Sequence, residues 1–432
     1  MKKNPMIHFL SVLLLFCGCQ QTEKKTTYPD GFDAAPRHVR VIWTEQPSHH
    51  AIISWSTLFE KGNENVVYYD TVPRLGRTNQ YAFQMKAKRN GEITMLDMDF
   101  TEGVPPGYFH HSEINDLLPL TKYFFVVETD GQISDEYYFI TAPKEDRTLA
   151  VLWGGDSRLG GINPVYAGNT PHIGRQNMNR VIAGLIDRQE DIFAFLHGAD
   201  YAKTAEWRHL FWWFEDHQLV KGKDNRLLPL VISRGNHDEA IGFLENFWLG
   251  NLSDKNSFNY YFHTRFTPEV SIITLNTEIS VRGDQRGWLE KELAATRPEK
   301  RWLVVHYHRP AYPVAQSFNH DTAPRLREAW VPLFEKYNID LAAESDGHIL
   351  KRTLPIRNNK PDETGIVYVG EGGLGVPQRV VDDTTRWYIQ PPGFAASADN
   401  VFMFTFRQDS LLVTAYGADG NVLDEYGRIP RQ

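Results

Sequence analysis

Cysteine is almost absent from this chain of 432 residues. The two cysteines are Cys17 and Cys19, both near the N-terminus, so the rest of the chain has no internal disulfide and no cysteine ligand for a metal. An excess of basic residues is missing as well, because the net charge is −8 and the pI is near 6.1. Without surplus positive charge to neutralise phosphates, the composition argues against a nucleic-acid-binding protein.

No long apolar run marks the N-terminus as a membrane span. Residues 6–17 are mostly apolar, but they fall short of the roughly 20 residues that a helix needs to cross a bilayer. This run follows two lysines and ends in LFCGC at 15–19, which resembles a bacterial lipoprotein cleavage box with Cys19 as the lipidated residue. Ordinary signal-peptidase cleavage nearby is the alternative. We expect a lipoprotein signal peptide at 1–19, a polar tether at 20–35, and export to the bacterial envelope, anchored by lipid at the periplasmic or surface face of the outer membrane.

The chain is longer than a single core ordinarily supports, so we expect two domains. Residues 36–143 alternate short β-rich runs with turn signals, which predicts an all-β sandwich. Within it, LLPLTKY at 117–123 resembles the strand crossing of fibronectin type III modules, where the tyrosine anchors a corner. Residues 148–428 alternate strand-like runs with helical segments and predict an α/β domain, with one of its helices expected at 324–337.

Five short polar clusters lie in the second region, and each follows a strand-like apolar run. They are GDSR at 155–158, GAD at 198–200, GNHD at 235–238, HRP at 308–310 and DGH at 346–348. Polar side chains at the ends of consecutive buried strands can converge in one crevice. Carboxylate, amide and imidazole groups together suit hard or borderline divalent ions. Any one of the 16 histidines would ordinarily be a solvent-facing or hydrogen-bonded residue, but the ordered set of clusters indicates a metal site.

Two metal ions about 3.5–4 Å apart need a shared anionic ligand to offset their repulsion. Asp200, which lies between Asp156 and Asn236 in chain order, is the candidate for that bridge. Asn236 offers a neutral amide oxygen. His308 and His348 can bind through imidazole nitrogen if a neighbouring acceptor fixes the tautomer.

These motifs resemble those of a purple-acid-phosphatase-type metallophosphoesterase, a member of the calcineurin-like superfamily with an N-terminal fibronectin-like domain. The resemblance runs from about residue 36 to 425. WLVVHYHRPAY at 302–312 follows the family's strand ending in His-x-Pro-x-Tyr, and this alignment selects His308 over His306 as ligand. FNH at 318–320 resembles the segment that carries a substrate-facing histidine. The resemblance implies an α/β metallophosphoesterase sandwich preceded by a fibronectin-like β-sandwich.

The end of the site departs from the family pattern. The family has Gly-His-x-His, then Arg-Thr and Pro, and alignment on RTLP at 352–355 places Asp346 and His348 at the two histidine positions. A rival alignment on the Gly-His pair would make His348 the first ligand and put Leu350 in place of the second. We prefer the first alignment, because it needs no gap and keeps a competent ligand at both positions. Asp346 would add negative charge and favour oxygen-preferring ions such as Mn or Mg.

Two further departures concern the second cluster and the first. The family expects Asp-x-x-Tyr, whose tyrosine binds Fe(III) and gives the purple colour, but Lys203 stands at that position after Asp200. Tyr201 is adjacent in sequence and could point elsewhere. Arg158 stands where many metallophosphoesterases carry histidine. A guanidinium cannot ligate a metal, but it is well shaped to hold a phosphate oxygen.

The resemblance then assigns roles. One metal would be bound by Asp156, Asp200 and His348, and the other by Asp200, Asn236, His308 and Asp346. His237 and His320 would contact the phosphoryl oxygens or protonate the leaving group, and Arg158 would hold the phosphate.

The implied activity is hydrolysis of phosphate monoesters of the acid-phosphatase type, with two divalent or trivalent ions (Mn, Fe or Zn) that activate a water for attack on phosphorus. A phosphodiesterase or nucleotide pyrophosphatase is the alternative within the enzyme class, and a non-catalytic binding module is the alternative outside it. The partner would be a small phosphate ester, with membrane contact only through the lipid anchor and no nucleic acid.

Overall fold

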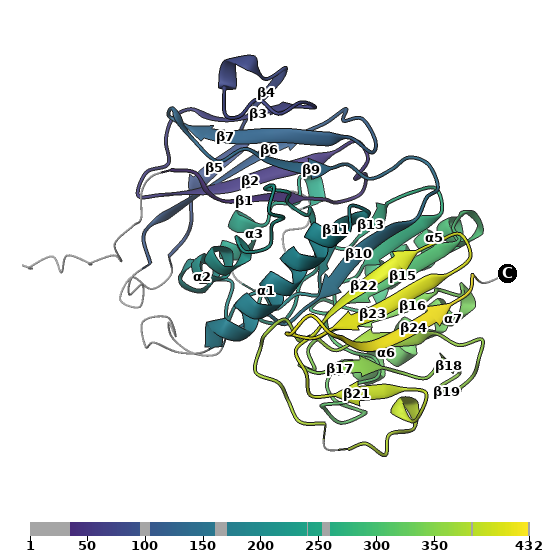
Figure 1. Ribbon diagram of the computed structural model, residues 1–432. Coiled ribbons are helices and arrows are strands. Elements are labelled where there is room, and N and C mark those ends of the chain that lie inside the picture. The colour runs from purple at the N-terminus through teal and green to yellow at the C-terminus, as the bar shows by residue number, and fades with distance from the viewer. Residues whose placement is uncertain are drawn as a thin grey trace, which may run out of the picture.

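The computed structural model describes residues 35–95, 104–159, 171–239, 241–252, 260–381 and 383–430 (Figure 1). The expected signal peptide and all but the last residue of the expected tether lie outside these ranges. No helix in the described part of the chain is both long enough and apolar enough to span a membrane.

The N-terminal region is a two-sheet β-sandwich, as the sequence predicts. Tyr123 forms the expected corner, because its hydroxyl oxygen accepts a hydrogen bond of 2.8 Å from the Leu118 N–H. One sheet contains β1 (Arg37–Ile42), β2 (Ala51–Leu58), β5 (Arg89–Glu92) and β6 (Gly107–Ile114). The other contains β3 (Asn65–Asp70), β4 (Phe83–Lys86), β7 (Lys122–Thr129), β8 (Gln132–Ile133) and β9 (Tyr137–Ile140).

The first sheet does not end within the N-terminal region. Strand β1 pairs in parallel with β12 (Leu230–Ile232) at Ile42 and Leu230, which joins it to the strands of the α/β region in one ten-stranded sheet. In that sheet β10 (Leu149–Gly154), β11 (Ile192–His197) and β12 run parallel. Beyond β10 the sheet continues with three antiparallel strands, which are β22 (Val401–Phe406), β23 (Leu411–Tyr416) and β24 (Val422–Arg428).

A second sheet of seven strands faces the first. Its central strands β14 (Val270–Thr274), β15 (Trp302–Tyr307), β16 (Leu341–Glu344) and β20 (Val367–Gly370) are parallel. Strand β15 is buried on both faces, since Val304 packs in the core between the sheets while Leu303 and Val305 pack in the core on the other side. This explains its near-continuous apolar run. The outer strands are β13 (Phe262–Arg265), β17 (Leu350–Arg352) and β21 (Phe394–Ala396), and β18 (Ile356–Arg357) pairs with β19 (Lys360–Pro361).

The helices lie outside the paired sheets. Those beside the ten-stranded sheet are α1 (Pro171–Arg188), α2 (Trp207–His217) and α3 (Ile241–Asn246), and those beside the second sheet are α5 (Gly283–Thr296), α6 (Ala323–Ala329) and α7 (Val331–Lys336) (Figure 1). The single helix expected at 324–337 is wrong, because the structure breaks it at Trp330. Pro332 explains the break: it lacks an N–H, and its ring would clash with the carbonyl of the residue four positions earlier. Short 3₁₀ turns occur at Thr78–Gln80, Arg297–Glu299 and Trp387–Ile389.

Candidate metal centre

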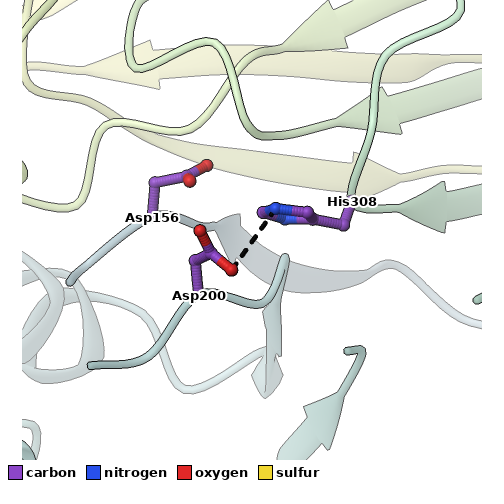
Figure 2. A group of neighbouring side chains, drawn as sticks. All are labelled: Asp156, Asp200 and His308. Atoms are coloured by element: carbon purple, nitrogen blue, oxygen red, sulfur yellow. Dashed lines mark ion pairs between the residues drawn. The ribbon is translucent and has the colours of Figure 1, made fainter. Parts of the chain in front are cut away.

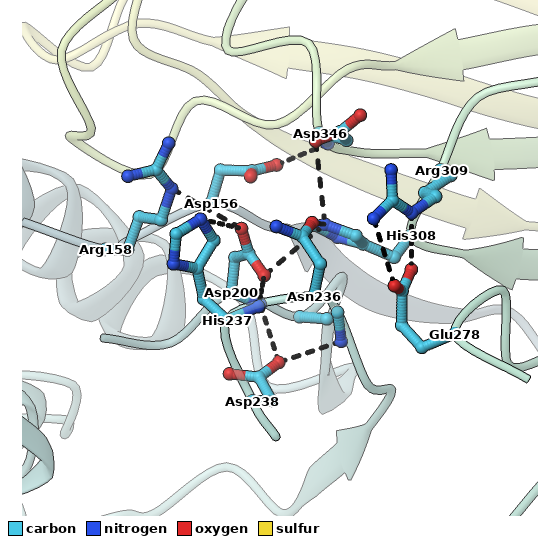
Figure 3. Close-up of polar contacts among 12 residues, drawn as sticks. Asp156, Arg158, Asp200, Asn236, His237, Asp238, Glu278, His308, Arg309 and Asp346 are labelled. Carbon is cyan, nitrogen blue, oxygen red and sulfur yellow. Dashed lines mark hydrogen bonds and ion pairs between the residues drawn. The ribbon is translucent and has the colours of Figure 1, made fainter. Parts of the chain in front are cut away.

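The polar clusters lie where parallel strands of both sheets end. Asp156, Asp200 and Asn236 follow β10, β11 and β12 of the first sheet, and His308 and Asp346 follow β15 and β16 of the second. Figure 3 shows these side chains converging from the two sheets. The crevice expected at consecutive strand ends therefore exists, but it is built from two sheets rather than one.

Three buried side chains form the centre of this group (Figure 2). One ligand atom from each of Asp156, Asp200 and His308 lies within 4.8 Å of the others. The His308 Nε2 atom is 3.4 Å from the Asp200 Oδ1 atom. All three residues are at most 1% exposed, so their charges are poorly screened by water.

His308 is oriented by the main chain. Its Nδ1 atom donates to the Gly198 carbonyl at 3.0 Å, which leaves Nε2 to face the cluster. There Nε2 lies 3.1 Å from the Asn236 Oδ1 atom and 3.9 Å from the Asp346 Oδ1 atom. The structure thus brings together the four residues assigned to the second metal, counting Asp200. His306, the rejected alternative, instead pairs its Nε2 with the Thr274 hydroxyl at 2.7 Å.

The residues assigned to the first metal are also adjacent. His348 places Nε2 at 3.4 Å from the Asp156 Oδ1 atom. Both atoms are buried, and neither has a hydrogen-bond partner among the described residues. A cation between these two buried atoms would give both of them the partner that they lack. Leu350, which the rival alignment treats as a lost ligand, is buried in β17.

Negatively charged side chains dominate the electrostatics of the cluster. Burial disfavours the charged form of His308, but the carboxylates of Asp200, Asp156 and Asp346 outweigh it and raise the pKa of His308 to about 10. Burial also raises the pKa of Asp200 despite the opposing attraction of His308. Three carboxylates are gathered around one imidazole, and this donor set fits the hard or borderline cations that the sequence predicts.

The backbone of the site is strained at its ligand positions. Asp156, Asp200, Asp346 and His348 have φ values of 56°, 54°, 68° and 56°, in the left-handed region that residues other than glycine rarely adopt. Such strain persists only where surrounding structure enforces it, and it clusters at functional sites. Gly372, with φ of 79°, is required here because a Cβ atom would lie 1.8 Å from the Asp156 Oδ2 atom.

Two of the three predicted catalytic residues contact the cluster. His237 donates from Nδ1 to the Lys203 carbonyl at 2.8 Å and directs Nε2 toward the Asp200 Oδ2 atom, 3.9 Å away. Arg158 places Nε 3.4 Å from the same oxygen (Figure 3). His320 does not join them: it is exposed in the segment between β15 and α6, and among the described residues its side chain has no hydrogen bond or ion pair.

Asp238 also belongs to the site, although the sequence motifs imply no role for it. Its carboxylate accepts from the N–H groups of Gly235 at 2.9 Å, Asp200 at 2.9 Å and Tyr201 at 3.3 Å. Burial, and next the charge of Asp200, raises the pKa of Asp238 to about 8. Asp238 holds the loops after β11 and β12 together and so fixes Asp200 and Asn236. Its place in the GNHD cluster was the available signal.

A buried ionic network lies behind the site. Lys351, fully buried, donates to Glu344 Oε2 at 2.6 Å and to Glu371 Oε1 at 2.8 Å. Glu371 also accepts from the Val314 N–H at 2.9 Å, which fixes the loop after His308. Gly347 packs directly on Glu371, because a Cβ there would lie 2.0 Å from Oε2. The network supports the turn that carries Asp346 and His348. Nothing in the sequence distinguishes these charges from surface residues.

Two family models match this chain. Residues 36–141 match the family "Purple acid Phosphatase, N-terminal domain", and residues 171–350 match the family "Calcineurin-like phosphoesterase". In both regions the chain is similar to metallophosphoesterases of the purple acid phosphatase type.

The similar proteins are distant. An uncharacterized protein of Mycobacterium tuberculosis is 24% identical over 72% of this chain, which spans 60% of that relative's length. The Fe(3+)-Zn(2+) purple acid phosphatase 12 of Arabidopsis thaliana is 23% identical over 85% of this chain and 81% of its own, and a phosphoenolpyruvate phosphatase of Allium cepa is 22% identical over 78% and 70%. The solved purple acid phosphatase from yellow lupin has the same fold, with a TM-score of 0.73, 20% identity, and coverage of 91% of this chain and 74% of its own.

Among the residues that the structure describes, no tyrosine takes the place at this site that the purple acid phosphatase motif gives to its tyrosine. Tyr201 is fully buried and points away from the cluster: its ring stacks on His197 with centroids 4.0 Å apart, and its hydroxyl donates to the Ser233 carbonyl at 3.2 Å. Burial raises the pKa of Tyr201 well above its ordinary value, which disfavours a tyrosinate. Lys203 occupies the tyrosine position, with its carbonyl bonded to His237.

An iron-loaded sample is therefore expected to lack the strong visible charge-transfer band of an iron–tyrosinate centre. Absorption spectra of the wild type and of Tyr201→Phe should be the same, while the loss of the hydroxyl's hydrogen bond lowers the free energy of unfolding by about 1 kcal/mol. An intense visible band in the wild type that disappears in Tyr201→Phe would show that Tyr201 is a ligand.

Proposed function

We propose that this protein hydrolyses phosphate monoesters with the help of two metal ions. The observation that carries the proposal is the buried group of Asp156, Asp200 and His308, extended by the facing orphan atoms of Asp156 and His348. Its relatives support the same reaction class, since they include purple acid phosphatases and a phosphoenolpyruvate phosphatase.

The residues that would hold the ions divide as the sequence predicts. Asp156, Asp200 and His348 would bind one, and Asp200, Asn236, His308 and Asp346 the other. When bound, the two ions would supply Lewis acidity toward a phosphoryl oxygen and toward the attacking water.

The remaining side chains act on the substrate. The Arg158 guanidinium can donate to a phosphoryl oxygen, since it already reaches the edge of the cluster at Asp200. His237 keeps its Nδ1 proton on the Lys203 carbonyl, so Nε2 is the atom that, once it has taken a second proton from solvent, can pass that proton to the leaving oxygen. In the net reaction the water oxygen bonds to phosphorus, the ester P–O bond breaks, and the alcohol leaves with a proton beside inorganic phosphate.

Two synthetic substrates test this proposal. The metal-reconstituted protein should hydrolyse p-nitrophenyl phosphate faster than bis(p-nitrophenyl) phosphate, and a chelator should abolish both activities. Faster turnover of the diester would make the protein a phosphodiesterase. Tight metal binding without turnover of either compound would favour a non-catalytic binding module.

We also propose that the mature protein begins at Cys19 and is held at the bacterial envelope by its lipid. The support is the short apolar run that ends in Gly18-Cys19. Mass spectrometry of the N-terminus in membrane fractions should find lipidated Cys19, and an unlipidated N-terminus downstream of it would reject the anchor.

Metal preference should reflect the carboxylate at position 346. Asp346 adds negative charge and a hard oxygen donor, so the wild type is expected to favour Mn over Zn relative to Asp346→His. Competition titrations of the two ions, read as bound metal by mass spectrometry, give the ratio directly. If the variant shows the same Mn-to-Zn ratio as the wild type, Asp346 does not contribute a ligand.

A further inference from the structure

Arg379 lies on the loop after β20 and is fastened to the turn that carries two candidate ligands. Its Nη1 atom donates to the Asp346 carbonyl at 2.8 Å, and its main-chain N–H donates to the His348 carbonyl at 3.1 Å. The preceding residue is also held, because the Gln378 side chain donates to Asp399 Oδ1 at 2.7 Å and to the Val376 carbonyl at 2.9 Å. The guanidinium is therefore kept beside the metal cluster by a well-anchored loop.

Two of the three guanidinium nitrogens of Arg379 remain available to donate to a ligand. Within the described ranges, no protein group bonds its Nε or Nη2 atoms, and neither atom is among those buried without a partner. The residue is half-buried, so these donors reach solvent at the edge of the site. A planar guanidinium with two unfilled donors is suited to a carboxylate or phosphate.

The other arginine near Asp346 is already neutralised. Arg309 donates from Nε to Glu278 Oε1 at 2.8 Å and is also paired with Asp321. Both Arg309 and Arg379 stabilise the ionised Asp346: burial would raise its pKa, but His308, Gln316 and these arginines hold the pKa below its ordinary value. Of the two, only Arg379 keeps donors for a ligand.

The two available arginines stand at different residues of the cluster. Arg158 reaches the carboxylate of Asp200, and Arg379 is bonded to the main-chain carbonyl of Asp346, a residue that Figure 3 draws on the other side of Asp156 from Arg158. If Arg158 holds the scissile phosphate, Arg379 is placed to hold a different part of the same molecule.

We propose that Arg379 is a specificity-determining residue that binds a second oxyanion, a carboxylate or a further phosphate, on the alcohol portion of the substrate. The inference rests on the proposed phosphomonoesterase activity. It narrows the substrate class from phosphate esters in general to organic phosphates with two anionic groups.

The test compares substrates that differ only in the second group. 3-Phosphoglycerate and glycerol 3-phosphate share a carbon chain and differ by a carboxylate, and fructose 1,6-bisphosphate and fructose 6-phosphate differ by a phosphate. In Arg379→Ala we expect kcat/KM to fall roughly 10- to 100-fold for the doubly anionic member of the preferred pair, with less than about a 3-fold change for its partner. The pair that responds identifies the oxyanion as carboxylate or phosphate.

Gln378→Ala is the matched control, because it loosens the same loop without removing a cation. It should leave the ratio of the two kcat/KM values unchanged. Equal losses for both members of each pair in Arg379→Ala would mean that the residue only positions the Asp346 turn, and no loss in either pair would also overturn the proposal. A wild type that turns over none of these compounds nor p-nitrophenyl phosphate would instead reject the phosphatase function itself, and the inference with it.

Discussion

His308→Ala is expected to lower the turnover of a phosphate monoester on the order of 1000-fold, beyond the roughly 10- to 100-fold that losing an outer hydrogen-bond partner of a metal ligand costs. The reason is that Nε2 of His308 is the nitrogen around which Asp200, Asn236 and Asp346 converge. Removing it also removes the donor to the Gly198 carbonyl. Steady-state kinetics together with bound metal per chain measure the effect.

His306→Asn is the control for this variant, since His306 lies two residues earlier and is equally buried. Its Nε2 atom contacts Thr274 rather than the cluster. The control should lower the melting temperature while metal content and turnover remain near wild type. A His308→Ala protein with wild-type rates and tightly bound metal would show that the assignment of this ligand is wrong.

The folded state is expected to lose stability in mild acid, as the pH falls from about 6.5 to about 4.5. His110 is fully buried on β6, with its ring stacked on Trp55 and its nitrogens bonded to Thr57 and Asn90. Burial, with a smaller contribution from nearby cations, lowers the pKa of His110 to about 3. Burial likewise holds the pKa of its neighbour His111 well below its ordinary value.

The sign follows from linkage. In the unfolded chain these histidines titrate near pH 6.5, so the folded state, which keeps them neutral, has its full stability above that pH and loses it as the pH falls. His110 alone costs about 2 kcal/mol by pH 5, and His111 adds a loss of the same sign. A total stability of about 5–15 kcal/mol leaves little margin for several such groups.

Thermal melts of the same sample at pH 8, 6.5 and 5 measure this loss. The melting temperature should change little between the first two and fall steeply at pH 5. His110→Gln, which cannot take up a proton, should show a shallower fall than the wild type. Equal melting temperatures at pH 8 and pH 5 would contradict the account.

The sequence predicts this fold well where its signals are local. The apolar runs before each polar cluster are the parallel strands, and Tyr123 forms the corner that its motif indicates. The sequence cannot show that β1 pairs with β12, because this contact joins residues far apart in the chain. The break at Trp330 could be predicted from Pro332, because a proline inside a helix interrupts it and is favoured in the first turn of the helix that follows.

The site, like the fold, has features that the sequence predicts and features that it does not. Strand-end position brings Asp156, Asp200 and Asn236 together, because the carboxyl ends of parallel strands share an edge. The sequence does not show in which direction the Tyr201 side chain points. In the structure the aromatic residues packed around it turn its hydroxyl into the protein core and away from the metal cluster. The contacts of Lys351 and Arg379 join segments that meet only in the folded chain, so no spacing in the sequence reveals them.

Metal stoichiometry tests the central claim most directly. The wild type, reconstituted with Mn, Fe or Zn and freed of unbound ions, should retain about two ions per chain, and chelation should remove them together with p-nitrophenyl phosphate hydrolysis. Re-addition of metal should restore both. Fewer than about one ion per chain, or hydrolysis that survives complete removal of metal, would contradict the dinuclear site on which the proposed function depends.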